Sequence, residues 1–301
     1  MSEPAPVPDD ETGFDHILSF TIPDMHARGR AVRLGPVLDT ILSAHAYPAA
    51  IRNLLAEALV IGGLIGSLLE DGAQLTMQVQ TEGGIVDLLV VDYRGGELRG
   101  YVRHDPERLA MLGANPSLYA LFGKGYLAIT FDLASSGQRY QGIVPLEGDT
   151  LSECCQDYFA QSEQVPTLLR VAVRCEGGHC VAGGLLVQHL PEGEEGRERL
   201  HVRMDHPEWE HVAALAGSTR HDELVDPALS LEALVWRLFH DEREVRVQRG
   251  AALVRGCRCS AEHYQDVLGK FSEADRAEMR GDDGLVSIDC AFCSKKFGIA
   301  V

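Results

Sequence analysis

The sequence has little positive charge. Its 27 Lys and Arg residues are outnumbered by 45 Asp and Glu residues, so its formal net charge is −18. Because binding to nucleic-acid phosphates needs a basic surface, this balance argues against DNA or RNA as the main partner. A strongly acidic chain instead stays dispersed in water through its own charge.

Long apolar segments and a secretory signal are missing as well. The longest apolar run, residues 59–69, contains three glycines and is much shorter than the roughly 20 residues needed to cross a bilayer. Within it, Gly62 and Gly66 have a spacing that, outside a long apolar span, indicates close helix packing. The chain starts with MSEPAPVPDDETG, which is acidic and rich in proline. We therefore expect no membrane segment, a cytoplasmic location and cysteines that stay reduced.

Cysteine, by contrast, is well represented, and four of the eight cysteines form two close pairs near the C-terminus. Cys257 and Cys259 make a C-x-C pair, and after 30 intervening residues Cys290 and Cys293 make a C-x-x-C pair. Residues i and i+2 of an extended chain point the same way, and a C-x-x-C turn directs both sulfurs at one ion. Four thiolates complete a tetrahedral shell for zinc. The spacing therefore predicts that these four cysteines bind one Zn²⁺ per chain.

The segment that carries these cysteines, residues 256–301, is too short to fold on hydrophobic packing alone. Zinc binding to such sites contributes about 10–16 kcal/mol, so we expect the segment to fold with zinc and unfold without it. Its core candidates are Tyr264, Val267, Leu268, Phe271, Met279, Leu285, Ile288, Phe292, Phe297 and Ile299. Arg255, Arg258, Lys295 and Lys296 favour the thiolate form, which oxidants attack. A redox switch and a purely structural zinc site are both compatible with this pattern.

The remainder of the chain reads as a larger domain followed by a linker. We expect a disordered tail over residues 1–13 and an α+β domain over 14–191, because helical periodicity near its start gives way to alternating strands separated by glycine turns. The fold class is α+β, with an antiparallel-sheet and helix domain, a helical linker and a small zinc module.

Residues 192–255 form the predicted linker. It begins with a highly charged stretch and continues as amphipathic helices over about 206–225 and 230–242. These helices are too short and too charged to hold a core of their own, so their apolar side chains must lie on a neighbour. The side chains on this face include Trp209, Leu234, Val235, Leu238 and Phe239.

Four further cysteines lie in the larger domain. Cys154 and Cys155 are adjacent on a predicted helix, where we interpret them as packing residues. Cys175 and Cys180 flank a predicted hairpin turn. A cross-strand disulfide is conceivable there, but we favour two unpaired thiols.

Several segments spread over nearly the whole chain carry a family resemblance. They are Tyr47-Pro48, residues 140–151 (YQGIVPLEGDTL), residues 157–159 (DYF), residues 162–164 (SEQ), residues 166–167 (PT), residues 182–184 (AGG), residues 234–240 (LVWRLFH) and the two cysteine pairs. Together they resemble the redox-regulated 33-kDa heat-shock chaperones, the heat shock protein 33 family.

This resemblance implies an ATP-independent holdase rather than an enzyme. The reduced form would bind zinc through the four cysteines and be inactive. Oxidation would form the disulfides Cys257–Cys259 and Cys290–Cys293, release zinc, and unfold the zinc module and the linker. The active form would be a homodimer that binds unfolded or partly folded proteins. We expect the client-binding surface to include the linker residues Trp209, Leu234, Val235, Leu238 and Phe239.

Two other functions compete with this interpretation. A zinc-ribbon protein would bind nucleic acid, but the charge of −18 argues against it. A thiol–disulfide oxidoreductase would need one reactive C-x-x-C at a helix N-terminus, whereas here a second pair accompanies it. The sequence also shows no Ser-His-Asp arrangement and no phosphate-binding glycine loop, so we do not expect an enzyme.

Overall fold

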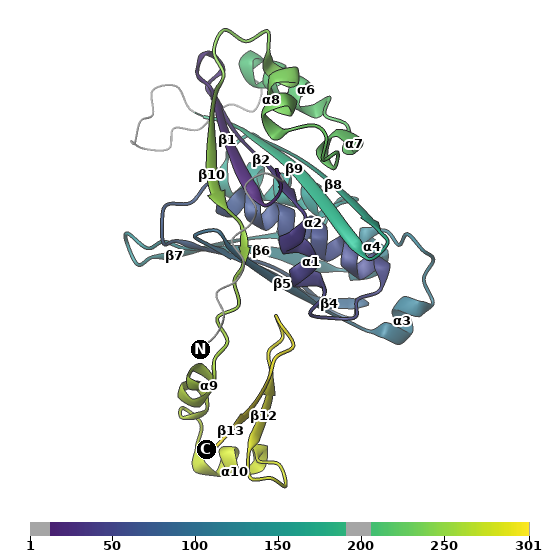
Figure 1. Cartoon of the computed structure of the whole chain (residues 1–301), viewed down its shortest axis with the longest axis vertical. Helices are drawn as coiled ribbons and strands as arrows, with labels where there is room; N and C mark the ends of the chain where they lie inside the picture. The colour runs from purple at the N-terminus through teal and green to yellow at the C-terminus, as the bar shows by residue number, and fades with distance from the viewer. Residues whose placement is uncertain (1–12, 191–205, 301) are drawn as a thin grey trace.

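Two antiparallel sheets and the helix between them form the main body of the molecule (Figure 1). The computed structural model describes residues 13–190 and 206–300. Nearly all of the expected N-terminal tail and the charged start of the linker therefore lie outside the described residues. The structure confirms the α+β class, with the small cysteine-bearing module at the C-terminal end.

The first sheet has five strands, in the order β10 (Arg246–Ala252), β1 (His16–Ile22), β2 (Ala27–Leu34), β9 (His179–His189) and β8 (Thr167–Glu176). The second has six, in the order β11 (Val254–Arg255), β5 (Glu97–His104), β4 (Val86–Arg94), β3 (Gln74–Thr81), β6 (Gly125–Asp132) and β7 (Arg139–Pro145). Every pairing is antiparallel except that of β11 with β5. The linker thus contributes an edge strand to each sheet.

Helix α2 (Ala49–Gly66) fills the space between the sheets. Gly62 and Gly66 face β4 so closely that an added Cβ would lie 2.5 Å from Val91 Cγ1 and 2.3 Å from the Tyr93 ring, which confirms the interpretation of close packing. By length and composition α2 could cross a membrane, but 72% of it is buried inside the protein, as in a core helix.

Shorter elements complete the main body: a 3₁₀ turn (Pro23–Met25), α1 (Pro36–Leu42), α3 (Pro106–Ala110), α4 (Leu118–Phe122), α5 (Leu151–Tyr158) and a π turn (Phe159–Glu163). Thr150 and Glu153 form a capping box at the start of α5, which places Cys154 and Cys155 in the core. Burial raises the pKa of Cys154 to about 11 and also raises that of Cys155, so both thiols stay protonated. They are packing residues, as predicted.

The hairpin of β8 and β9 corrects one prediction from the sequence. Gly177 and Gly178 both have positive φ, which gives a two-residue turn that places Cys175 directly opposite Cys180. Their Cα atoms are 4.1 Å apart, and the two cysteines form a disulfide. The expectation of two unpaired thiols was wrong because the turn fixes the register that brings the sulfurs together.

Three linker helices cover the outer face of the first sheet: α6 (Pro207–Gly217), α7 (His221–Leu224) and α8 (Leu231–Phe239) (Figure 1). They form a second hydrophobic core with β1, β2 and β9, as their narrow apolar faces predicted. Arg33 of β2 is almost fully buried below them and donates hydrogen bonds to the carbonyls of Glu223, Leu224 and Leu229. One buried guanidinium thereby fixes α7 and the start of α8 to the sheet.

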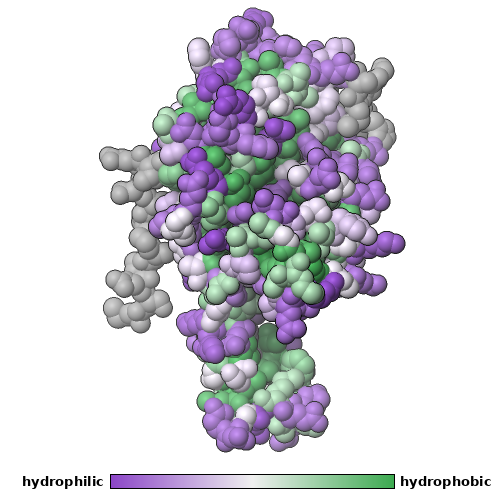
Figure 2. All heavy atoms as spheres, turned by 90° about the vertical axis from the view of Figure 1, so that its right-hand side faces the viewer, coloured by the Kyte–Doolittle hydropathy of each residue, from purple (hydrophilic) through white to green (hydrophobic). Residues whose placement is uncertain are grey.

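The C-terminal module is a narrow lobe beyond the second sheet, with apolar atoms visible on its surface (Figure 2). It consists of α9 (Ala261–Leu268), α10 (Glu273–Met279) and a hairpin of β12 (Val286–Asp289) and β13 (Lys296–Ile299). Its buried hydrophobic side chains are Leu268, Val286 and Ile299, with Tyr264, Ile288 and Phe297 packed against them. Several other core candidates were wrong: Val267, Phe271 and Met279 are exposed, because the module is too thin to enclose them.

Candidate metal centre

Local chain geometry brings the four predicted cysteines together. Cys290 follows β12 and Cys293 precedes β13, so the C-x-x-C pair forms the turn of the hairpin. Ser294 has a φ of 56° in this turn, and its N–H donates to the Cys290 carbonyl at 2.8 Å. Cys257 and Cys259 follow β11, so they are held near the edge of the second sheet.

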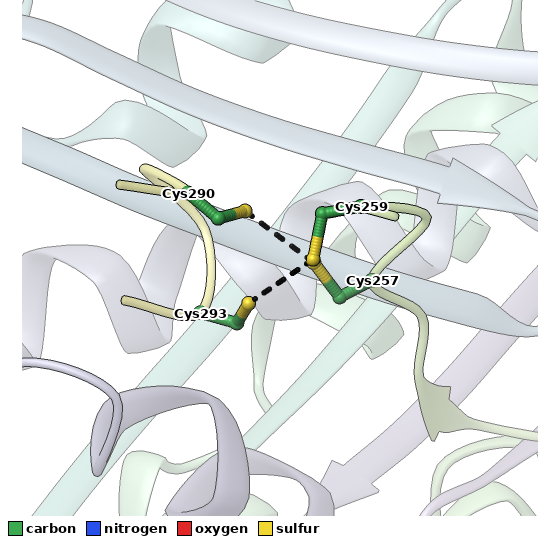
Figure 3. A group of neighbouring side chains, drawn as sticks. All are labelled: Cys257, Cys259, Cys290 and Cys293. Carbon is green, nitrogen blue, oxygen red and sulfur yellow. Dashed lines mark hydrogen bonds between the residues drawn. The ribbon is translucent and has the colours of Figure 1, made fainter. Parts of the chain in front are cut away.

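The sulfurs lie at distances that fit one metal ion (Figure 3). The Cys257 sulfur is 3.3 Å from that of Cys259 and 3.6 Å from that of Cys290, and the Cys259 and Cys293 sulfurs are 3.4 Å apart. A tetrahedral zinc site with Zn–S bonds of about 2.3 Å has S–S edges of roughly 3.8 Å. The four sulfurs are therefore close to a tetrathiolate shell, and closing on an ion requires only a slight expansion.

The electrostatics of the cluster favour a bound cation. Burial alone would raise the pKa of Cys290, but hydrogen bonds from the N–H groups of Cys293 and Phe292 and from the Tyr264 hydroxyl lower it to about 7. Burial raises the pKa of Cys259 and of Cys293. Four thiolates this close repel one another unless a positive charge lies between them. A divalent metal bound here would supply that charge and would hold all four in the thiolate form.

The turn that carries Cys290 and Cys293 packs against the second sheet. Phe292 lies edge-on to Tyr101 with ring centroids 5.0 Å apart, and the Arg99 guanidinium lies 4.0 Å from the centre of the Phe292 ring. His45 bonds to the same turn through both ring nitrogens, to the Ala291 carbonyl at 2.9 Å and the Ser294 hydroxyl at 3.1 Å. The cysteine cluster thus lies between the module and the main body.

Arg258, between Cys257 and Cys259, fixes the other side of the cluster. Its guanidinium donates to Gln74 Oε1 at 2.8 Å and lies 3.9 Å from Glu97. The N–H of Gly256 donates to the Leu98 carbonyl at 3.0 Å. Arg258 and Lys295 are two of the basic residues that were expected to favour the thiolate form. Arg258 points to the second sheet, and Lys295 lies over the ring of Phe297.

The linker residues predicted to bind clients lie in the second hydrophobic core. Trp209, Leu234, Val235 and Phe239 are buried and Leu238 is partly buried, whereas the neighbouring Trp236 is 66% exposed. Phe239 packs on Phe20 of β1 with ring centroids 5.6 Å apart. In this arrangement the apolar face is covered by the first sheet.

The contacts that hold the module and the linker in place were not predicted from the sequence. His45, Arg99 and Tyr101 come from the main body and meet Phe292 only in the folded chain. Arg33 lies in a strand with several other arginines, and its partners are about 190 residues away along the chain. The available signal was that Arg33 shares a strand face with Ala31, and this face is covered if the apolar side of the linker helices packs on it.

The comparisons with known proteins agree with this architecture. A family model described as Hsp33 protein matches residues 15–300. The chain is 39% identical over 289 residues to a 33 kDa chaperonin of Caulobacter vibrioides (strain NA1000 / CB15N), covering 93% of each chain. It is 31% identical over 283 residues to a 33 kDa chaperonin of Escherichia coli O7:K1 (strain IAI39 / ExPEC), covering 94% of this chain and 91% of the relative.

A solved structure shares the fold. The crystal structure of a 33 kDa chaperonin, the heat shock protein 33 homologue of Thermotoga maritima, superposes with a TM-score of 0.77 at 20% identity and covers 95% of each chain. The match of the family model over nearly the whole chain, together with these relatives, shows that the protein belongs to the Hsp33 family.

Proposed function

We propose that this chain is an ATP-independent holdase that binds unfolding proteins under oxidative and heat stress, with the four-cysteine cluster as its redox switch. The observation that carries the proposal is the position of the cluster. Its sulfurs lie within 4.8 Å of one another, three of the pairs at 3.3–3.6 Å, at the point where a module with little core of its own meets the main body. Family membership supplies the class of partner, unfolded or partly folded proteins.

In the reduced state the cluster holds one Zn²⁺, and the metal stabilises the module. Within the described part of the module, the buried hydrophobic cluster has only three members, Leu268, Val286 and Ile299, and Cys290 is the one further buried side chain. Segments near 40 residues generally need a disulfide or a metal to fold. The roughly 10–16 kcal/mol of apparent binding energy at a structural zinc site is comparable to the whole stability of an ordinary domain. Loss of zinc therefore unfolds the module.

Oxidation removes the ligands. Two molecules of hydrogen peroxide oxidise the four thiolates, which form two S–S bonds and give up four electrons. With four protons taken up, the peroxide is reduced to four molecules of water and Zn²⁺ is released. We propose the neighbouring pairs Cys257–Cys259 and Cys290–Cys293, as in the family that the sequence resembles. The measured sulfur distances would allow pairing across the two halves equally well, so the resemblance alone supports this choice.

Unfolding of the module is transmitted to the linker through continuous chain. Strand β11 pairs with β5 and leads directly into Cys257, while β10 forms the edge of the first sheet beside β1. When the module unfolds, the contacts of Phe292 and Arg258 with the second sheet are lost. Strands β10 and β11 each pair on one side only, at the edge of a sheet, and β11 has only two residues, so they are the next part of the structure to open.

Release of the linker exposes the client-binding surface. Helices α6 and α8 then uncover Trp209, Leu234, Val235, Leu238 and Phe239 together with the apolar face of the first sheet. An exposed apolar patch of this kind binds unfolded chains, and the strongly acidic remainder of the surface keeps the complex dispersed. We further propose that the oxidised form is a homodimer and that the protein acts in the cytoplasm, without nucleic-acid or membrane partners.

Simultaneous measurement of zinc and linker opening tests this sequence of events. Reduced, zinc-loaded protein is treated with peroxide at elevated temperature, released zinc is followed with a chelating dye, and hydrogen exchange is measured over residues 206–252. We expect about one zinc per chain to leave the four-cysteine site and the linker to lose protection in step with it. Cys154→Ser is the matched control, since this thiol is buried in the core of the main body and does not belong to the cluster. A linker that stays protected after zinc release would contradict the mechanism.

A further inference from the structure

A second group of metal-ligating side chains lies where β9 ends and α6 begins, at the end of the molecule opposite the C-terminal module (Figure 1). It consists of His189, the last residue of β9, His206, the N-cap residue of α6, and Glu208 in the first turn of α6. One ligand atom from each residue lies within 4.8 Å of the other two. His206 Nδ1 and Glu208 Oε2 are 3.7 Å apart.

Each residue has one candidate ligand atom that is buried and that finds no hydrogen-bond partner among the described residues: His189 Nδ1, His206 Nδ1 and Glu208 Oε2. A buried polar atom without a partner costs about 1–3 kcal/mol, so three that face one another call for a shared partner. A cation placed between them would satisfy all three at once.

His189 is the most deeply buried member of the group. Its side chain is only 3% exposed, and its Nδ1 is buried with no hydrogen-bond partner in the part of the chain that the structure describes. A neutral imidazole offers the lone pair of one ring nitrogen to a metal ion. His189 therefore presents an unused nitrogen to the space that it shares with His206 and Glu208.

We propose that His189, His206 and Glu208 bind a divalent transition-metal ion, with Zn²⁺ as the best match. Two imidazoles and one carboxylate are a common donor set for zinc, whereas Mg²⁺ and Ca²⁺ prefer oxygen ligands alone. A fourth position is open to water or to His26, whose Nε2 lies 3.9 Å from Glu208 Oε2. A tetrahedral zinc shell needs the ligand atoms somewhat closer than they lie here, and rotation of the His206 and Glu208 side chains, each about one-third exposed, can supply this.

The site joins the first linker helix to the main body. His189 belongs to the core sheet, while His206 and Glu208 precede Trp209 on α6, and the rings of Trp209 and His189 are 6.2 Å apart. A bound metal would hold α6 on the sheet with no contribution from a thiol. This consequence rests on the proposed function: the second metal would oppose release of the linker after the four-cysteine site has been oxidised.

Metal stoichiometry of the reduced full-length chain tests the site directly. Metal-free protein is titrated with Zn²⁺ in competition with a chelating dye, and in parallel with Co²⁺. We expect two equivalents for the wild type and one for His206→Gln and for Glu208→Gln. Both substituted side chains are about one-third exposed, so the variants should fold. His211→Gln is the matched control, because His211 lies on the same helix but bonds to Glu242; it should retain two equivalents.

The Co²⁺ spectrum separates the two sites. Thiolate ligands give an intense charge-transfer band, whereas nitrogen and oxygen ligands do not, so the second equivalent should add no charge-transfer absorption. A wild type that binds one equivalent would show that Glu208 only pairs with protonated histidines, and variants that still bind two would place the second ion elsewhere. Either result overturns the proposal. Neither depends on chaperone activity, so failure here is distinguishable from failure of the proposed function.

Discussion

Replacement of Phe292 by alanine should loosen the cysteine module from the main body without disturbing its metal ligands. Phe292 lies at the tip of the C-x-x-C turn, edge-on to Tyr101 and 4.0 Å from the Arg99 guanidinium. The substitution removes both contacts and leaves the four sulfurs unchanged. It therefore separates the contribution of packing from that of the metal.

The size of the effect follows from the two contacts. An edge-to-face aromatic pair is worth about 0.5–1.5 kcal/mol beyond its buried area. A cation–π contact in this partly exposed setting adds about 0.5–1 kcal/mol. The sum, about 1–2.5 kcal/mol, corresponds to a roughly 5- to 60-fold increase in the ratio of detached to attached module.

Hydrogen exchange on the reduced, zinc-loaded protein measures this ratio. We expect Phe292→Ala to speed exchange in the turn that carries Cys290 and Cys293 and in the paired β11 and β5, while bound zinc stays at the wild-type level. Phe271→Ala is the matched control, because this phenylalanine belongs to the same module and is 43% exposed. If Phe292→Ala exchanges no faster than Phe271→Ala, packing of the turn contributes nothing and the reasoning is refuted.

Four further outcomes are expected. Arg33→Met removes three hydrogen bonds to linker carbonyls, each worth about 1.5–3 kcal/mol because the donor is charged. The amide hydrogens of α7 should therefore exchange much faster. Unchanged hydrogen exchange would contradict the role of Arg33. Leu234→Ala, at a buried position of α8, should weaken linker packing by about 2–5 kcal/mol. This variant should bind clients, and so suppress light scattering from their aggregation, while zinc is still bound. Zinc loss before client binding would contradict this. Burial raises the pKa of Asp15 to about 6 from its ordinary value of 3.8, so the buried charge destabilises the fold above pH 6, and this cost is relieved as the pH falls toward 4. In thermal unfolding, the wild type should gain at most about 3 kcal/mol of stability over this range relative to Asp15→Asn. Equal pH profiles of the two proteins would refute this. Alkylation of denatured, metal-free, unreduced protein should label six cysteines, because Cys175 and Cys180 are paired; eight labelled cysteines would contradict the disulfide.

Features that depend on neighbours in the chain were predictable from the sequence. The C-x-C and C-x-x-C spacings predicted the four-sulfur cluster because each pair is arranged by a few residues of local backbone. The hairpins were predictable because paired glycines such as Gly177 and Gly178 adopt positive φ in tight turns. The linker helices were predicted to pack on a neighbour because their apolar faces are narrow.

Features that depend on distant segments were not predictable. Phe292 was assigned to the core of the module, but it packs on Tyr101 of the main body, since hydrophobicity alone does not say which surface a side chain covers. The buried Arg33 finds its carbonyl partners about 190 residues later. The cluster of His189, His206 and Glu208 exists only because the end of β9 meets the start of α6. Each of these contacts is set by tertiary packing, for which one sequence carries no periodic signal.

The most direct measurement of the central claim is light scattering from a chemically unfolded client diluted into buffer. One sample contains reduced, zinc-loaded protein and the other contains protein oxidised with peroxide at elevated temperature. If the four cysteines are a redox switch, only the oxidised sample should suppress aggregation, in step with release of zinc from the four-cysteine site. Equal behaviour of the two samples, or suppression with that zinc still bound, would show that the cluster is a structural metal site and would contradict the account.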